Sequence, residues 1–347
     1  MPSLFDQSCL LSAESTDTAS RHIGDILHYA FGHSNQSAIV VYDQRCPLTM
    51  TLAEAYHRQL PAAQFIDFDQ TPPQVILDSF AGLHAGDLVV LIQSTNFRLE
   101  AYRLRVELFK RGLKVIEHPH LIRMPGAEGL IYIDSLAYDP AYFRETGRKL
   151  QEAIATADYA EIDSGNGSKL RFGGRLEAAR LNVGDYSGMN NVGGQFPIGE
   201  VFTESVRLED VSGEVNVFIF GDTRFLINRP EQPVTLIVEA GQVTGTRNST
   251  PEFDQVLANI RADDGVIWVR ELGFGLNRAF SRERTVTDIG TYERMCGIHL
   301  SLGSKHGSYA KPHIKRGEGR HHIDVFAVTE GVDIGGRQVY RDGAWVV

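Results

Sequence analysis

The stretch DLVVLIQSTNFRLEAYRLRVELFKRGLKVIEH, residues 87–118, decides the fold class of the N-terminal half. Two continuous apolar runs, 87–94 and 113–118, flank a segment at 97–112 whose apolar residues recur at helical spacing. Runs of this length without polar alternation are typical of strands buried on both faces of a parallel sheet. The stretch therefore predicts a strand, a crossover helix and a second strand.

The same pattern continues on both sides of this stretch. Further strands are expected at 38–43, 63–68 and 129–134, and further helices at 51–60, 71–83 and 139–158. This order predicts an α/β domain with a mostly parallel, doubly wound sheet over residues 1–158. No GxGxxG or Walker-type glycine loop follows any of these strands, so we interpret the domain as structural rather than nucleotide-binding.

From residue 159 to 347 the expected strands become shorter and alternate apolar with polar residues. They are expected at 159–164, 169–175, 215–222, 233–245, 266–272 and 338–347, with one helix at 251–263. Asp342-Gly343 is a strong hairpin signal. The second half is therefore predicted to be a β-rich α+β domain.

Composition narrows the class of protein. The 347 residues are 42% hydrophobic, and the formal net charge is −10 without a run dense in Lys and Arg, so nucleic acid is not an expected partner. Three scattered cysteines do not form a disulfide framework, and no apolar run is long enough for a membrane span. We expect a soluble, cytoplasmic protein without a membrane partner.

Imidazoles and carboxylates concentrate in the C-terminal half. In GRHHIDVF (319–326), His322 and Asp324 are two apart and point to the same side of a strand, and CGIHLSL (296–302) places His299 and Ser301 on its polar face. Either histidine alone would suit a sheet position bonded to a backbone carbonyl. Together with Asp324 they favour metal ligation.

Two glutamates join this set. Glu200 begins a strand in QFPIGEVFTESV (195–206), and Glu271 begins ELGFGLN (271–277), where Gly273 and Gly275 allow a close backbone approach. Each glutamate alone could be a surface carboxylate. Their occurrence beside the histidines favours ligands.

These motifs resemble those of the thermophilic metallo-aminopeptidases, also called the aminopeptidase T family. The resemblance covers most of residues 160–347, including the terminal hairpin VYRDGAWV, and marks the chain as a short, divergent member. It implies a homodimer and a site in which two divalent ions, zinc first and cobalt, manganese or iron as alternatives, activate water to cleave a small peptide or amide. The implied ligands are Glu200, Glu271, His299, His322 and Asp324.

The expected catalytic residues are Glu271 and three others. Glu293 is a candidate proton acceptor or a partner of a metal ligand, and a solvated glutamate is the alternative. The family places a tyrosine seven residues after its histidine, whereas this chain has His306 there and Tyr309 three residues later. Either residue is expected to take the place of the tyrosine.

The basic stretch around these residues has two interpretations. SKHGSYAKPHIKRGEGRHHID (304–324) is a solvated loop, or it supplies Lys311, Lys315 or Arg320 to bind a substrate carboxylate.

Two other functions stay open at this point. A ring-cleaving, iron-dependent dioxygenase of dihydroxypyridine resembles this family in fold and keeps the His-x-Asp pair, but it has histidine in the place of Glu271. Two histidines and one carboxylate would suit Fe²⁺ here as well. A non-catalytic protein that keeps the metal centre only for structure is the other alternative.

Overall fold

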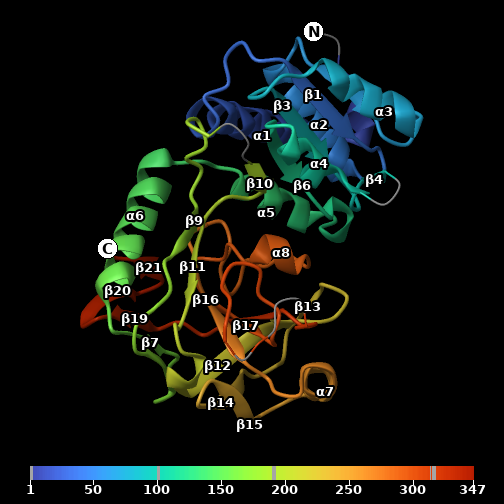
Figure 1. The fold of residues 1–347 in the computed structure, drawn as a ribbon. Coiled ribbons are helices and arrows are strands. Elements are labelled where there is room, and N and C mark those ends of the chain that lie inside the picture. The colour runs from blue at the N-terminus through green and yellow to red at the C-terminus, as the bar shows by residue number, and fades with distance from the viewer. Residues whose placement is uncertain (1–2, 100–101, 190–192, 313, 315–317) are drawn as a thin grey trace. The chain divides into compact units, whose positions relative to one another are not determined.

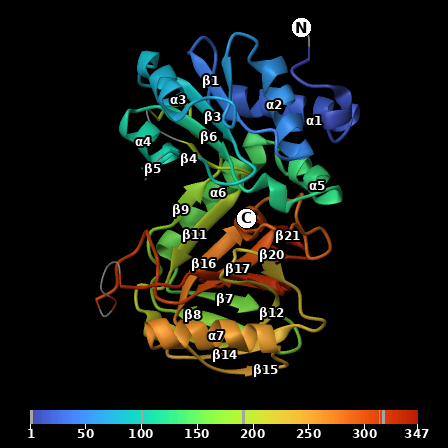
Figure 2. The same ribbon diagram turned by 90° about the vertical axis from the view of Figure 1, so that its right-hand side faces the viewer.

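The computed structural model describes the whole chain except residues 1–2, 100–101, 190–192, 313 and 315–317. It consists of two compact units, drawn in Figures 1 and 2. The first comprises residues 1–141, 184–198 and 285–287, and the second comprises residues 142–183, 199–284 and 288–347. The helix 140–156 thus falls almost entirely in the second unit, where the sequence had suggested a boundary near residue 158.

The first unit contains a five-stranded, all-parallel sheet in the order β10-β6-β3-β1-β2. Its strands are β1 (Ala38–Tyr42), β2 (Gln64–Asp67), β3 (Leu88–Ile92), β6 (Lys114–His118) and β10 (Gly193–Gln195). The predicted strands at 38–43, 63–68, 87–94 and 113–118 are confirmed, because continuous apolar runs fit strands that are covered on both faces.

The helices of this unit are α1 (Ala13–Asp25), α2 (Pro47–Gln59), α3 (Pro73–Ser79), α4 (Leu104–Lys110) and α5 (Ala127–Ser135). Short helical turns add Gln7–Cys9, Ile26–Ala30, Phe80–Gly82 and Leu121–Arg123. Ile76 of α3 and Leu108 of α4 belong to one core cluster with alternate residues of the sheet such as Val89 and Leu91, which fixes these two helices on one face.

Two predictions for this unit were wrong in whole or in part. The run 129–134 lies in α5 rather than in a strand; a short apolar run does not separate a strand from a half-buried helix, and Leu130 is 45% exposed while Tyr132 is buried. The helix expected at 97–112 begins only at Leu104, because Arg98–Leu99 (β4) and Tyr102–Arg103 (β5) pair as short antiparallel strands.

The second unit is built on one large antiparallel sheet, whose central path runs β21-β20-β19-β7-β8-β12-β18-β17-β16-β11-β9. Its outer strands are β7 (Tyr159–Asp163), β8 (Lys169–Gly173), β9 (Arg180–Asn182), β13 (Ile227–Asn228), β14 (Val234–Glu239), β15 (Gln242–Arg247), β19 (Gly331–Ile334), β20 (Arg337–Arg341) and β21 (Ala344–Trp345). Its central strands are β11 (Glu200–Glu204), β12 (Val211–Gly221), β16 (Val269–Gly275), β17 (Gly297–Leu302) and β18 (Ile323–Ala327).

Three helices accompany this sheet: α6 (Pro140–Thr156), α7 (Pro251–Asp264) and α8 (Ile289–Tyr292), with a helical turn at Leu208–Asp210. Phe253 of α7 contacts Phe220 of β12 with ring centroids 4.6 Å apart, which holds the helix on the sheet. The predicted helix at 251–263 and the hairpin at Asp342-Gly343 are confirmed, and both hairpin residues have positive φ.

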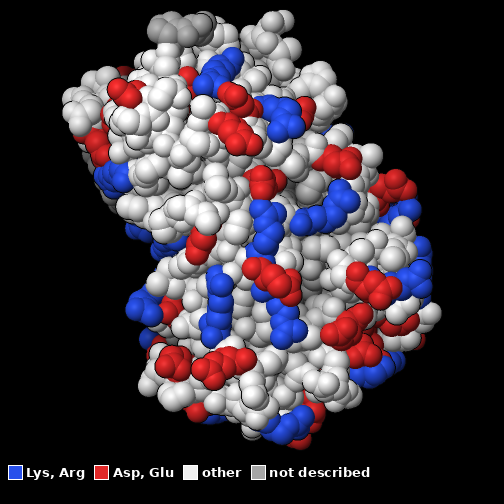
Figure 3. All heavy atoms as spheres, turned by 180° about the vertical axis from the view of Figure 1, so that it is seen from behind, with Lys and Arg blue, Asp and Glu red and all other residues white. Residues whose placement is uncertain are grey.

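Two surface properties bear on the expected partners. Within the described residues, no helix is both long and apolar enough to cross a membrane. Basic and acidic side chains are mixed on the face drawn in Figure 3.

Candidate metal centre

Four neighbouring strands, β11, β16, β17 and β18, carry four of the five predicted ligands. The first three of these strands are labelled in Figure 1. Residues directly opposite each other on paired strands project to the same face of a sheet. The register pairs Glu200 with Gly275, Gly273 with His299, and Ser301 with Asp324. Since Glu271, Gly273 and Gly275 alternate along β16, all four ligands lie on one face.

Gly273 makes room for the histidine. A Cβ atom at this position would lie 2.1 Å from both Nε2 and Cε1 of His299, far inside van der Waals contact. The imidazole therefore lies directly over the glycine, between Glu200 and Glu271 on the two sides. The close approach predicted for this glycine is confirmed, and the group that approaches is the ring of His299, a predicted ligand.

Gly275, which also lacks a side chain, lets the backbone at Arg294 and Met295 cross close to β16. A Cβ atom there would lie 1.9 Å from the carbonyl oxygen of Met295 and 2.9 Å from the carbonyl carbon of Arg294. The backbone of Asn277 also donates to the Arg294 carbonyl at 2.8 Å. This crossing brings the Arg294 side chain to Glu200, the residue that pairs with Gly275.

Glu200, Glu271 and His299 form the centre of the site. His299 Nε2 lies 3.3 Å from Glu200 Oε1 and 3.2 Å from Glu271 Oε1, and all three side chains are at most 10% exposed. Among the described residues, one donor atom from each of the three lies within 4.8 Å of the others, as a shared metal ion requires.

His322 and Asp324 form a second pair of donors. His322 Nε2 lies 3.1 Å from Asp324 Oδ1, while its Nδ1 lies 3.0 Å from the backbone carbonyl of Lys305. That carbonyl accepts a hydrogen bond from Nδ1–H, so the neutral ring presents an unprotonated Nε2. A backbone carbonyl behind an imidazole is a common support of a metal-binding histidine.

His306 also reaches the site, with the opposite tautomer. Its Nε2 lies 2.9 Å from Glu271 Oε2, and its Nδ1 accepts the backbone N–H of Ser308 at 3.1 Å. The neutral ring must therefore carry its proton on Nε2. In this tautomer His306 places an N–H group beside Glu271, although the contact lacks hydrogen-bond alignment.

Tyr309 is held away from the donor atoms. Its hydroxyl donates to the Ala178 carbonyl at 2.8 Å and lies 3.2 Å from the Phe202 carbonyl, while its ring contacts His306 with centroids 5.2 Å apart. Of the two residues expected to replace the family tyrosine, His306 is the one beside a predicted ligand.

The pKa values of the carboxylate of Glu271 and of the two imidazoles shift in opposite directions. Burial raises the pKa of Glu271, but the contacts with His299 and His306 outweigh it and hold that pKa below its usual range. Burial lowers the pKa of His299, and the carboxylates of Glu200 and Glu271 reverse this to about 10. For His322 the same opposition, with Asp324 as the partner, also raises the pKa to about 10.

Glu293 is the exception among the carboxyl groups. Burial, followed by the negative charge of Asp324, raises its pKa well above the ordinary value, although Arg294 acts in the opposite direction. A carboxyl group with a raised pKa beside ionised carboxylates is suited to accept and return a proton near neutral pH.

The donor set fits a divalent ion. Four buried atoms of the site have no hydrogen-bond partner within the described part of the chain: Nε of Arg294, Nδ1 of His299, Nε2 of His306 and Oδ1 of Asp324. The short contacts of the last two atoms with Glu271 and His322 therefore lack hydrogen-bond alignment. Unpaired buried polar atoms are costly, and carboxylate oxygens with imidazole nitrogens are the donors that zinc, cobalt, manganese and iron accept.

The loop after β17 is supported by a buried ion-pair network that the sequence did not reveal. Arg270 binds Glu204 through two contacts of 2.8 and 3.1 Å and donates to the carbonyls of Ser304 and Tyr309. The register of β16 against β17 shifts at Arg270 and Glu271, an irregularity that re-aims side chains next to a site. The only sequence signal was the strand alternation that places Glu204 on the face of Glu200.

The predicted substrate-binding cations lie in different surroundings. The Lys311 ammonium is 1% exposed and contacts Glu177 at 2.7 Å and Glu204 at 3.0 Å, so it supports the loop. The Arg320 side chain is 72% exposed and lies 3.6 Å from Asp263. Lys315 lies outside the described residues.

Asp264, the last residue of α7, ties both ends of this loop. Its carboxylate accepts the backbone N–H groups of Ser304 and Arg320, each at 2.9 Å, and of His321 at 3.3 Å. His306 and His322, which follow the two ends, are thereby fixed relative to β17 and β18.

The raised pKa values of His299 and His322 predict that metal binding releases protons. Both rings are protonated at pH 7 in the metal-free protein and must become neutral to bind an ion, so we expect release of about two protons per site and an affinity that rises from pH 6 to pH 9. Titration calorimetry in buffers of different ionisation enthalpy measures this number. Uptake without proton release would contradict ligation by these rings.

The stability of the metal-free protein should fall as pH rises, whereas its metal affinity should increase. A pKa raised on folding stabilises the metal-free protein fully below the unfolded value of about 6.5, and this contribution is lost as pH rises through about 10. The Tm difference between metal-loaded and metal-free protein should therefore widen between pH 6 and pH 9.

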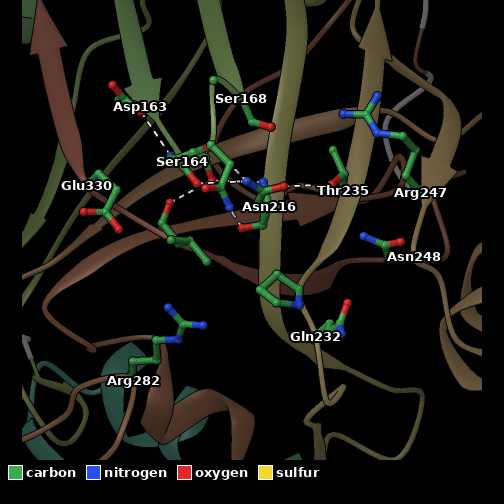
Figure 4. A pocket seen from close by; sticks show the side chains of 15 residues that line it. Asp163, Ser164, Ser168, Asn216, Gln232, Thr235, Arg247, Asn248, Arg282 and Glu330 are labelled. Carbon is green, nitrogen blue, oxygen red and sulfur yellow. Dashed lines mark hydrogen bonds between the residues drawn. The ribbon is translucent and has the colours of Figure 1, made fainter.

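A separate cavity of about 840 Å³ in the second unit contains none of the predicted ligands (Figure 4). Its polar wall is internally bonded, with Asn216 donating to the Ser164 carbonyl at 2.9 Å and accepting from Thr235 at 2.7 Å. The metal centre is thus distinct from this cavity.

Comparisons with known proteins agree on the fold. No family model and no curated protein sequence matches the chain. The structure of 2,5-dihydroxypyridine dioxygenase from Pseudomonas putida KT2440 has a TM-score of 0.62 at 16% identity, covering 96% of this chain and 97% of its own. Wild-type AmpT from Thermus thermophilus has a TM-score of 0.58 at 13% identity, covering 95% of this chain and 99% of its own.

At these identities the likeness concerns the fold alone. The resemblance to aminopeptidase T, stated above for residues 160–347, is confirmed at that level and extends over nearly the whole chain. The chain shares its fold with both AmpT and 2,5-dihydroxypyridine dioxygenase.

Proposed function

We propose that this protein is a metal-dependent hydrolase that cleaves a small amide, most simply the N-terminal peptide bond of a short peptide. The observation that carries the proposal is the buried group of Glu200, Glu271 and His299. Glu293 lies near it, and the negative charges of Asp324 and Glu200 help to raise the pKa of its carboxyl group. A divalent ion held there would polarise a carbonyl and lower the pKa of water.

The side chains around the ion would have two roles: proton transfer and orientation of a ligand. Glu293 would take a proton from the attacking water and return it to the leaving nitrogen, because its pKa is raised well above the ordinary value of a carboxyl group. His306, with its proton on Nε2, would keep Glu271 ionised and oriented. The likeness to AmpT supports the aminopeptidase as the first candidate.

An iron-dependent ring-cleaving dioxygenase is the second candidate. The likeness to 2,5-dihydroxypyridine dioxygenase, together with His299, His322 and Asp324 as two imidazoles and one carboxylate, favours it. Assembly as a homodimer and a cytoplasmic location remain predictions.

Metal removal and reloading tests these candidates. Chelator-stripped protein should lose hydrolysis of aminoacyl anilides and short peptides, with at most about 1% left, and should regain it with Zn²⁺, Co²⁺ or Mn²⁺. Oxygen uptake with dihydroxypyridine after anaerobic Fe²⁺ loading would support the dioxygenase instead. Metal uptake without either activity would favour a non-catalytic centre.

A further inference from the structure

A buried arginine lies among the carboxylates of the centre. Nη1 of Arg294 is 3.1 Å from Glu200 Oε2 and 2.6 Å from Glu293 Oε2, and the side chain is 7% exposed. The same Glu200 places its other oxygen, Oε1, 3.3 Å from His299. One carboxylate is thus shared between the guanidinium and the group that fits a metal ion.

The position of this arginine is built into the fold. The absent side chain of Gly275 admits the backbone at Arg294 and Met295, and the bond from Asn277 N–H to the Arg294 carbonyl fixes the crossing. Because Glu200 pairs directly with Gly275, the crossing delivers the guanidinium to that carboxylate. Burial lowers the pKa of Arg294, but the carboxylates of Glu200 and Glu293 outweigh it and raise that pKa, so the guanidinium stays charged.

Charge balance limits what else the centre can hold. Glu200, Glu271, Glu293 and Asp324 carry at most about four negative charges. The guanidinium and one divalent ion leave at most about one negative charge, whereas a second divalent ion would leave a net positive charge in a buried site. A second ion beside Glu200 and Glu293 would also compete with Arg294 for the carboxylate oxygens that the guanidinium contacts.

We propose that Arg294 takes the place of a second cation, so that the centre binds one divalent ion per chain rather than two. The inference rests on the proposed metal centre and replaces the two-ion expectation from the sequence. It also makes Arg294 a positioning residue, which holds Glu200 and Glu293 in fixed orientations toward the single ion.

Metal stoichiometry tests the proposal without an activity assay. Wild-type protein, stripped and then titrated with Co²⁺ or Mn²⁺, should bind one ion per chain by calorimetry and elemental analysis. Arg294→Gln frees two carboxylates and should bind two ions, with Mn–Mn coupling visible by paramagnetic resonance. Arg294→Lys, which keeps the charge, and Arg282→Gln, which removes an exposed arginine, should both keep a stoichiometry of one.

The outcomes are separable. Two ions in the wild-type protein would overturn this inference and leave the proposed hydrolase intact, whereas no bound ion would overturn the proposed metal centre itself. A folded Arg294→Gln protein that still binds one ion would also overturn the inference. If that variant does not fold, wild-type stoichiometry and Arg294→Lys decide: two ions in either overturn it, and one in both supports it.

Discussion

Glu271→Gln is expected to lower kcat/KM for amide hydrolysis by about a thousandfold, within the range for loss of a catalytic charged group. Glu271 contacts His299 through Oε1 at 3.2 Å and His306 through Oε2 at 2.9 Å. The amide keeps the shape but removes the negative charge, and it places an NH₂ group against one of the two imidazoles. A ligand and the orientation of His306 are lost together.

The measurement is steady-state kinetics at saturating metal, with metal affinity determined in parallel. Glu239→Gln makes the same chemical change at the exposed end of β14 and should leave both quantities unchanged. Hydrolysis that survives Glu271→Gln at the wild-type rate would remove this residue from the reaction.

Gly273→Ala is expected to weaken metal binding strongly and to destabilise the protein, although it adds only one methyl group. The new Cβ would lie 2.1 Å from His299 Nε2, so the ring must leave its position between Glu200 and Glu271. Overpacking of this kind costs about 1–3 kcal/mol, and we expect metal affinity to fall by at least about a hundredfold.

Thermal unfolding of metal-free and metal-loaded protein separates the two effects. The lower Tm of the variant without metal reports overpacking, and a Tm that no longer rises when metal is added reports the loss of the centre. Gly245→Ala in β15 is the matched control, because its Cβ would meet nothing nearer than 3.5 Å. Metal-dependent stabilisation of Gly273→Ala equal to that of the wild type would contradict the placement of His299.

Local sequence was sufficient for most of the elements. Continuous apolar runs such as 87–94 predicted buried parallel strands, and the alternation around His299 and Asp324 predicted which face each side chain occupies. Both follow from backbone geometry that acts over a few residues. The run 129–134 failed because its length is compatible with a strand or a helix, and burial against neighbours decided between them.

Candidate ligands were also visible in the sequence, since Glu, His and Asp recur at the ends and on the polar faces of strands. The sequence did not show how these residues come together in space. Glu200 and Glu271 are separated by 71 positions, and the antiparallel pairing of β11 with β16 places them on either side of one imidazole.

The sequence by itself thus determined the strand faces, the close approach at two glycines and the chemical type of the donor set. Only the tertiary structure decided that the Gly273 approach seats the His299 ring, that Nε2 of His306 faces Glu271, and that the Gly275 crossing brings Arg294 to Glu200. The physical reason is the distance along the chain over which each effect acts. Strand alternation and turn preference depend on residues that are near in sequence, whereas charge pairing and steric fit depend on residues that only folding brings together.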